Sequence, residues 1–271
     1  MTLHEFLTQY LSMRAVSPAY AATLRKRTAK LEVFLGRGEL AYCFNEATIN
    51  RFLESLTDLQ SATRNKYRAD FLAIWRAAAD CDLVPYPQPR RLRRERHLPQ
   101  VIECYTAGET RSILAAAERL PGAYSNGVAR RHYWPAIIRA AWDTGLRRGD
   151  LWRLRSQQIR KDRTAIIVQN KTAQAIMVRF HQKTVKALDL AGGSLEWVQC
   201  EWCFGEHFWD IVTQCGLNRG TFRWIRRGSG STIEAAHPGL GHKQLGNTEG
   251  VFRRHYDAKL GDAERPMVPE L

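Results

Sequence analysis

Apolar side chains recur at helical spacing through the first 84 residues of the chain. The first run comprises Leu3, Phe6, Leu7 and Leu11, whose three- and four-residue intervals place them on one helix face. Further runs of this kind cover residues 18–34, 46–56 and 62–75. Asn45 and Ser61 precede the last two and have side chains that can cap a helix. The pattern therefore predicts an N-terminal domain of four or five short helices.

The pattern changes after Tyr105, where helical and strand periodicities alternate. Apolar runs at helical spacing cover residues 106–120, 132–143, 183–190 and 208–215. Two β-rich runs, TAIIVQ (164–169) and AIMVRF (175–180), are joined by NKTAQ in the manner of a hairpin. The fold class expected for the chain is therefore mostly α with a small β-sheet, a helical domain followed by an α+β domain.

A segment rich in proline and arginine separates the two patterns. Residues 85–100 contain four prolines and five arginines against a single glutamate. Proline removes a backbone donor and stiffens the chain, so this composition predicts a linker between domains at 1–84 and 101–271. Its arginines Arg90, Arg91, Arg93 and Arg94 are candidates to lie along a nucleic acid backbone.

The charge of the chain narrows the class of partner. Lys and Arg number 41 against 27 acidic residues, which gives a formal charge of +14 and a pI near 9.9. Such an excess favours a polyanionic partner, and arginine offers a planar fork that suits phosphate oxygens. No run of about 18 apolar residues and no signal peptide is found, so we expect no membrane span and a cytoplasmic protein.

Cysteine usage gives a weaker indication. The six cysteines are spread along the chain in a way that does not resemble the disulfide framework of a secreted domain. Cys200 and Cys203 form a CxxC motif, with His207 and Cys215 downstream, and these four could bind zinc. The segment is rich in aromatic residues, so we favour buried thiols packed beside rings and expect no metal.

Two clusters in the second half carry basic residues that could hold a phosphate. In DTGLRRGDLWRL (143–154), Arg147 follows Gly145, and Asp150 lies three residues later on the same helical face, where it could orient the arginine. In GTFRWIRRGSGS (220–231), Arg226 follows the apolar Ile225 and precedes small residues. A buried arginine requires an anion, and a phosphodiester is one.

Two further clusters carry groups that could transfer a proton or attack a substrate. Lys171 lies at the tip of the expected hairpin and could act as a general acid if neighbouring cations lower its pKa. Tyr256 lies near the C-terminus beside Arg253, Arg254 and His255. A tyrosine has a pKa near 10 and needs cationic surroundings to act as a nucleophile.

Taken in order, these clusters resemble the tyrosine recombinase (phage integrase) family. That family has an Arg in a TGLR motif, an acidic residue three positions later, a hairpin Lys, an HxxR motif, an LGH turn and a late Tyr. Here Arg147, Asp150, Lys171, Arg226 and Tyr256 occur in that order at matching spacings. SATRNKYRADFLAIWRAA (61–78) also resembles part of the family's helical core-binding domain. The resemblance covers roughly residues 3 to 258. The order of the motifs is more specific than any one motif alone.

The sequence departs from the family pattern at two positions. Arg223 occupies the place of the His in HxxR, so that proton-handling role is altered. Gly241-His242 matches the LGH turn by letters but lies fourteen residues before Tyr256. Leu245-Gly246-Asn247 fits the family spacing of about nine residues, so we prefer Asn247 for that position and keep His242 as a candidate.

The resemblance implies a chemistry and a set of partners. Tyr256 would attack a DNA phosphodiester and form a 3′-phosphotyrosyl bond, while Arg147 and Arg226 stabilise the transition state. Lys171 would protonate the leaving 5′ oxygen, Asp150 would orient Arg147, and Asn247 or His242, helped by Arg223, would contact the phosphate. No metal or nucleotide cofactor would be required. The implied partners are double-stranded DNA and a homotetramer that joins two duplexes.

Three alternatives stay open on the sequence alone. A catalytically silent DNA-binding protein with this fold would explain the change at Arg223. A type IB topoisomerase-like enzyme would use the same chemistry on one duplex, although the small N-terminal helical domain favours a recombinase. An RNA-binding module is the third alternative, but no aromatic strand motif of the RRM type is present.

Overall fold

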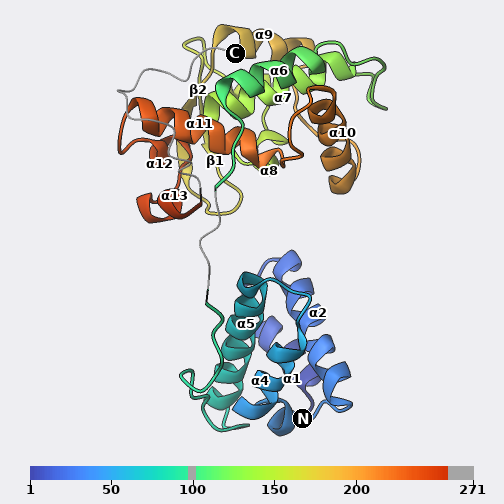
Figure 1. The fold of residues 1–271 in the computed structure, drawn as a ribbon, viewed down its shortest axis with the longest axis vertical. Helices are drawn as coiled ribbons and strands as arrows, with labels where there is room; N and C mark the ends of the chain where they lie inside the picture. Colours follow the sequence, from blue (N-terminus) through green and yellow to red (C-terminus); the bar gives the residue numbers. More distant parts are fainter. Residues whose placement is uncertain (97–101, 256–271) are drawn as a thin grey trace. The chain divides into compact units, whose positions relative to one another are not determined.

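The chain divides into two compact units, Met1–Pro99 and Gln100–Leu271. A computed structural model describes residues 1–96 and 102–255, with the side chains of 253–255 left out (Figure 1). Each unit has its own buried cluster of apolar side chains. Within the described residues, no helix is long and apolar enough to cross a membrane.

The first unit is helical, as the apolar spacing predicts. Its helices are α1 (Leu3–Met13), α2 (Pro18–Leu35), α3 (Leu40–Cys43), α4 (Glu46–Ser55) and α5 (Ser61–Asp80). The Asn45 side chain accepts the backbone N–H of Thr48 at 2.8 Å and so caps α4, as expected. Ser61 is the first residue of α5 rather than its cap, because Gln60 occupies the capping position.

Residues 85–96 belong to the first unit and pack against its helix α5. The Trp75 indole donates to the carbonyl of Pro85, and Arg68 donates to the carbonyls of Pro89 and Leu92. The Leu92 side chain is buried in the apolar cluster of this unit. The described part of the expected linker is therefore tied to α5 by hydrogen bonds from side chains of that helix to its backbone carbonyls.

The second unit combines helices with one antiparallel hairpin. Its elements are α6 (Ala107–Ala117), α7 (Arg130–Thr144), α8 (Arg148–Leu151), η1 (Ser156–Gln158), β1 (Thr164–Val168), β2 (Ala175–Arg179), α9 (Gln182–Leu190), α10 (Glu201–Gln214), α11 (Arg223–Ala236), α12 (Gly241–Gln244) and α13 (Glu249–His255). The hairpin pairs Thr164 with Arg179 and Val168 with Ala175. The expected fold class, mostly helical with a small sheet, is confirmed.

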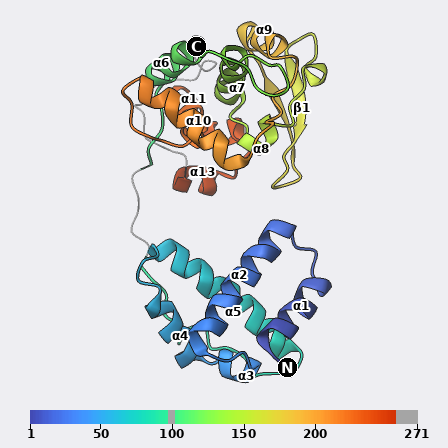
Figure 2. The same cartoon turned by 90° about the vertical axis from the view of Figure 1, so that its right-hand side faces the viewer.

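Helix α7 is central to the second unit and determines where the site lies. Its side chains from Trp134 to Trp142 are almost all buried, and it packs against α6, α9 and α11. The hairpin runs along one edge of the unit (Figure 2). Helix α10 begins at Glu201, seven residues before the predicted start at Phe208, because Cys200 occupies its N-cap.

Helix α11 was not predicted as a helix from its basic and small residues. It contains the run Gly228-Ser229-Gly230-Ser231, all four of which are buried. A side chain on Gly228 would overlap the backbone carbonyl of Tyr105, and one on Gly230 would crowd Leu245. The Ser229 hydroxyl donates to the carbonyl of Trp142 at 2.6 Å. The small residues therefore allow α11 to lie close to α7 and to the turn after α12.

Candidate functional site

Arg147 is placed by the end of helix α7. That helix stops at Gly145, which has a φ of +59° in the left-handed region that favours glycine. A side chain at Gly145 would overlap Leu245. The chain then turns, and Arg147 forms the N-cap of the short helix α8. The glycine therefore brings Arg147 out of a buried helix into a half-buried position.

Arg226 reaches the same turn from helix α11. Its side chain is buried and donates to the carbonyl oxygen of Gly145 and, at 2.8 Å, to that of Leu245. Both acceptors are backbone groups that leave the guanidinium charge in place. The sequence did not decide whether this arginine is buried or belongs to a surface cluster, and the structure shows that it is buried.

Asn247 links the two arginines. Its side-chain oxygen accepts from Arg147 at 3.1 Å and from Arg226 at 3.5 Å. Its Nδ2 is buried and has no hydrogen-bond partner among the described residues. We call Arg147, Arg226 and Asn247 the arginine clamp. It presents two cations and an unused amide donor, which is a combination suited to phosphate oxygens.

His242, the other candidate for the turn position, lies one turn earlier. Its backbone carbonyl accepts the N–H of Asn247 at 2.9 Å, which helps to form the turn. Its side chain makes no hydrogen bond within residues 1–96 and 102–255. Of the two candidates, the structure therefore brings Asn247 to the arginines and leaves His242 outside the clamp.

Asp150 has a different partner from the one expected. Its carboxylate is buried, and Oδ1 accepts the backbone N–H of Asn170 at 2.8 Å instead of holding Arg147. The other oxygen, Oδ2, has no described hydrogen-bond partner. Arg147 is the N-cap of α8 and has an extended backbone, so the three-residue spacing of a helix does not bring its side chain to Asp150. Asp150 instead secures the turn next to Lys171, which is itself exposed at the hairpin tip.

Sequence reasoning missed Gln169, the residue that follows β1. Its side chain is fully buried, and Oε1 accepts from Arg147 at 2.9 Å. It takes the place beside Arg147 that the sequence assigned to Asp150. The only signal in the sequence was a polar residue at the end of an apolar strand.

Arg223 lies one helical turn before Arg226 and is exposed at the start of α11. Its neighbour Arg227 donates to the carbonyl of Glu103 at 3.0 Å. Arg227 is thus engaged with the segment that enters the second unit.

Tyr256 lies outside the described residues, so the structure does not place its side chain. Helix α13 leads up to it and packs through Phe252, which is buried against Leu245. Leu245 also supplies the carbonyl that accepts from Arg226. The backbone that precedes Tyr256 is thus anchored beside the arginine clamp.

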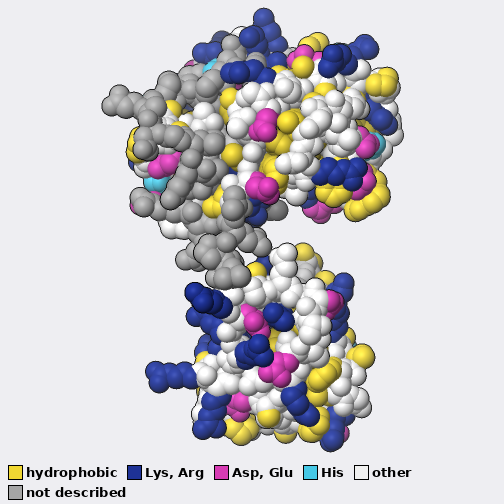
Figure 3. All heavy atoms as spheres, viewed as in Figure 1, with side chains coloured by type: hydrophobic (Ala, Val, Ile, Leu, Met, Phe, Trp, Pro, Cys, Tyr) yellow, Lys and Arg dark blue, Asp and Glu magenta, His cyan; other side chains and the backbone are white. Residues whose placement is uncertain are grey.

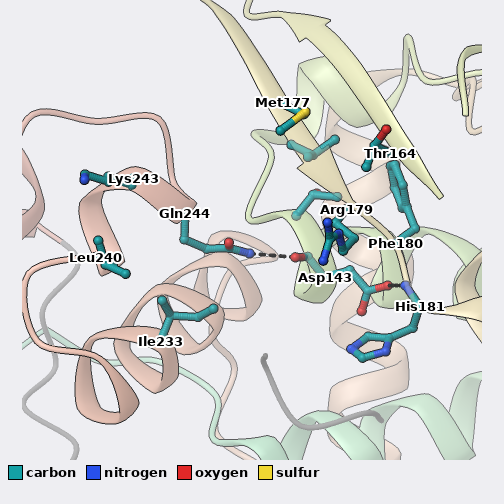
Figure 4. Close-up of a pocket in the computed structure, with 12 residues that line it drawn as sticks. Asp143, Thr164, Met177, Arg179, Phe180, His181, Ile233, Leu240, Lys243 and Gln244 are labelled. Atoms are coloured by element: carbon teal, nitrogen blue, oxygen red, sulfur yellow. Dashed lines mark hydrogen bonds between the residues drawn. The ribbon is translucent and has the colours of Figure 1, made fainter. Parts of the chain in front are cut away.

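A pocket of about 410 Å³ lies between the end of α7, strand β2 and helix α12 (Figure 4). The Gln244 side chain crosses it and donates to the carbonyl of Asp143 at 2.6 Å. The Asp143 carboxylate accepts the backbone N–H of His181, and burial raises the pKa of this carboxyl. Among its described lining residues, none is a predicted site residue. The hydrogen bond from Gln244 ties α12, and with it the turn that carries Asn247, to the end of α7.

The CxxC motif does not form the buried thiol pair that the sequence favoured. Cys200 is exposed, Cys203 is half-buried, and the two form a disulfide at the start of α10. The motif occupies the helix start, where chain curvature brings the two side chains together. Within the described residues, no group of three or more His, Cys, Asp or Glu side chains could hold a metal ion.

The arginines of the expected linker lie on the surface of the first unit. Arg90, Arg91, Arg93 and Arg94 are all exposed. Arg93 forms ion pairs with Glu54 at 3.0 Å and Glu95 at 3.1 Å. Lys and Arg side chains are spread over the face of each unit seen in Figure 3.

Comparison with known proteins gives structural matches but no sequence match. No protein-family model matches the chain, and no curated protein matches it. A lambda integrase (75–356) dimer bound to a COC′ core site is similar with a TM-score of 0.76 and 17% identity, over 98% of this chain and 99% of that one.

Two further solved structures have the same fold. The Tn1549 transposon integrase in complex with a circular intermediate DNA matches with a TM-score of 0.69 and 14% identity, over 94% of this chain and 95% of that one. The XerH site-specific recombinase bound to its difH substrate matches with a TM-score of 0.67 and 13% identity, over 88% of this chain and 75% of that one. The chain therefore has the fold of the tyrosine recombinases.

Proposed function

We propose that this chain is a site-specific DNA recombinase that cleaves and rejoins duplex DNA through a 3′-phosphotyrosyl bond to Tyr256. The observation that carries the proposal is the arginine clamp, in which two guanidinium groups from distant segments meet at one amide. The similar structures are integrases and recombinases solved with their DNA. The excess of basic residues is in keeping with a DNA partner.

In this proposal Arg147 and Arg226 bind the non-bridging oxygens of the scissile phosphate. Their positive charge offsets the negative charge that grows on those oxygens in the transition state. The free Nδ2 of Asn247 donates a further hydrogen bond to the phosphate. Arg223, exposed one turn away, contacts the flanking DNA backbone.

The bond changes use the tyrosine and the lysine. The Tyr256 phenol gives its proton to solvent as its oxygen attacks phosphorus in line, and the 5′ oxygen leaves as a hydroxyl with a proton from Lys171. Because Asp150 fixes the backbone next to Lys171, we assign it the role of positioning that lysine. In the reverse step, the 5′-hydroxyl of a partner strand gives its proton to Lys171 as it attacks phosphorus, and the Tyr256 oxygen leaves and takes up a proton from solvent.

The proposal extends to assembly and to the DNA contacts of the first unit. One of the similar structures is a lambda integrase tetramer bound to a Holliday junction, with a TM-score of 0.72. By analogy, four copies of this chain would join two duplexes, on the nucleoid within the cytoplasm. The helical first unit would act as the core-binding domain, with Arg90, Arg91 and Arg94 on the phosphate backbone.

A catalytically silent DNA-binding protein is the second candidate. The observation that favours it is the replacement of both proton-handling histidines of the family, by Arg223 and Asn247. Neither side chain transfers a proton near neutral pH. This candidate predicts DNA binding without a covalent product.

Trapping on nicked DNA separates the two candidates. Duplexes selected from a random pool for binding to the wild type are nicked so that cleavage releases a short strand and cannot be reversed. We expect a covalent protein–DNA band on a denaturing gel with wild type and none with Tyr256→Phe, while both bind the duplex. Tight binding by wild type without any covalent band would support the silent DNA-binding protein instead.

A further inference from the structure

We infer that Gln169 is a positioning residue that holds Arg147 without cancelling its charge and couples it to the loop carrying Lys171. The inference deepens the proposed function and rests on it, because it concerns how the same site binds a phosphate. It assigns a role to a residue that the family pattern does not include.

The position of Gln169 is unusual for a residue at a hairpin turn. It directly follows β1, and its backbone closes the turn by donating to the carbonyl of Gln174 and accepting from the N–H of Ala173, both at 2.9 Å. Its side chain is nevertheless 0% exposed. A buried carboxamide is costly unless its polar atoms are bonded, so its hydrogen bonds show what it does.

The Gln169 carboxamide joins three segments of the second unit. Its Oε1 accepts from Arg147 at 2.9 Å and from the Thr172 hydroxyl at 2.9 Å. Its Nε2 points to the carbonyl of Leu245 at 3.5 Å, the outer limit of a hydrogen bond. A side chain on Gly246 would come within 2.7 Å of that nitrogen, so the glycine allows this approach.

The chemistry of an amide explains why glutamine suits this position. A carboxylate would hold Arg147 more strongly but would also neutralise it. Both described acceptors of Arg147, Gln169 and Asn247, are neutral amide oxygens. They fix the direction of the guanidinium and leave its full charge for a phosphodiester, in a half-buried site where that charge acts strongly.

The same amide connects the arginine to the proposed general acid. Thr172 is bonded to Gln169, and the backbone N–H of Asn170 is bonded to Asp150. Lys171 therefore lies between Asn170 and Thr172, and each of these two neighbours is held by a hydrogen bond to a buried side chain. A displacement of Gln169 would move Arg147 and the Lys171 loop together.

Three variants test this inference on the full chain. Gln169→Glu adds a carboxylate beside Arg147, and Gln169→Met keeps the length of the side chain but removes its hydrogen bonds. Gln174→Glu places the same charge on an exposed position of the same hairpin and serves as the control. Each protein is assayed for DNA affinity between low and moderate salt, for the rate of covalent band formation on the nicked duplex, and for thermal unfolding.

We expect both Gln169 variants to cleave DNA more slowly but to differ in the salt dependence of DNA binding. Each phosphate neutralised contributes about 0.9 to the slope of log affinity against log salt concentration. Gln169→Glu should reduce this slope by about that amount, because Arg147 is neutralised, and should slow cleavage at least ~10-fold. Gln169→Met should slow cleavage to a similar extent with the wild-type slope, since the charge of Arg147 remains. Gln174→Glu should match wild type in slope and rate.

A wild-type slope and rate in Gln169→Glu, or a wild-type rate in Gln169→Met, would overturn the inference. Should Gln169→Glu fail to fold in the thermal assay, Gln169→Met decides alone through its rate and slope. If the wild type binds DNA but forms no covalent band, the proposed recombinase function is wrong. The salt slopes of the variants then still decide whether Gln169 preserves the charge of Arg147. A wild type that binds no duplex would overturn both.

Discussion

At the scale of single residues, the site is organised by uncharged groups around two fixed cations. Arg147 and Arg226 are held by amide and carbonyl oxygens of Gln169, Asn247, Gly145 and Leu245. An arginine stays protonated throughout the working pH range, so the clamp does not switch with pH. Any pH dependence of cleavage should therefore arise from the tyrosine and the lysine.

The roles of Asn247 and His242 can be separated by a pair of alanine variants. Asn247→Ala removes the acceptor shared by both guanidinium groups, and a hydrogen bond to a charged group contributes about 1.5–3 kcal/mol. We therefore expect cleavage to fall ~10- to 100-fold while DNA affinity changes much less. His242→Ala should leave the cleavage rate within about twofold, because its side chain is outside the clamp. A larger loss in His242→Ala than in Asn247→Ala would reverse the assignment of the turn position.

At the scale of elements, the ends of helices and strands bring the site together. Helix α7 stops at Gly145, β1 stops before Gln169, and α12 ends at the turn that carries Asn247. Because these ends are tied to one another, a change in backbone geometry at one of them should be transmitted to Arg226 and Arg147.

Two glycine variants measure how much the end of α7 contributes. Gly145→Ala forces a side chain into a left-handed conformation and against Leu245, so we expect a loss of about 1–3 kcal/mol in the free energy of unfolding. Gly205→Ala, inside α10 with no atom near its new side chain, should instead gain about 0.5–1 kcal/mol. Urea unfolding followed by tryptophan fluorescence reports mainly the second unit, since Trp75 is the only tryptophan in the first. Equal effects of the two substitutions would contradict the steric argument.

The sequence predicts the elements better than the contacts between their ends. Two β-rich runs joined by a short polar segment identify the hairpin, and apolar spacing identifies α1, α2 and α7, because both are local properties. The order of the motifs picks out Arg147, Arg226 and Asn247, which lie together in the structure, whereas the sequence did not decide whether Arg226 is buried. The partner of Asp150, the role of Gln169 and the pairing of Cys200 with Cys203 depend on long-range geometry or local chain curvature. Apolar periodicity carries no information about either.

At the scale of the whole molecule, the proposed function requires two basic units to bind one polyanion. The first unit presents exposed arginines on residues 85–96, and the second presents the clamp. Affinity for DNA is then a sum of phosphate contacts from both units and should fall steeply with salt.

The arginines on the first unit are not equivalent, and single substitutions should show this. Arg94 has no described ion pair, whereas Arg93 is already paired with two glutamates. Exposed ion pairs contribute little to stability, so neither change should affect folding. We expect Arg94→Ala to lower DNA affinity and reduce the salt slope by about 0.9, and Arg93→Ala to change both much less. Binding isotherms at several salt concentrations provide the comparison, and a larger effect of Arg93→Ala would show that DNA displaces its glutamates.

The buried run from Gly228 to Ser231 has a consequence for the descent of such chains. These small residues admit the carbonyl of Tyr105 and the side chains of Leu245 and Phe252, so they are required for packing whether or not DNA is cleaved. A chain of this fold that did not cleave DNA would have no need of a nucleophilic tyrosine. It would still need these glycines, because a larger side chain at Gly228 or Gly230 would overlap its neighbours and destabilise the fold. In a divergent relative, the presence of this glycine and serine run alone would therefore indicate a shared fold and would not indicate DNA cleavage.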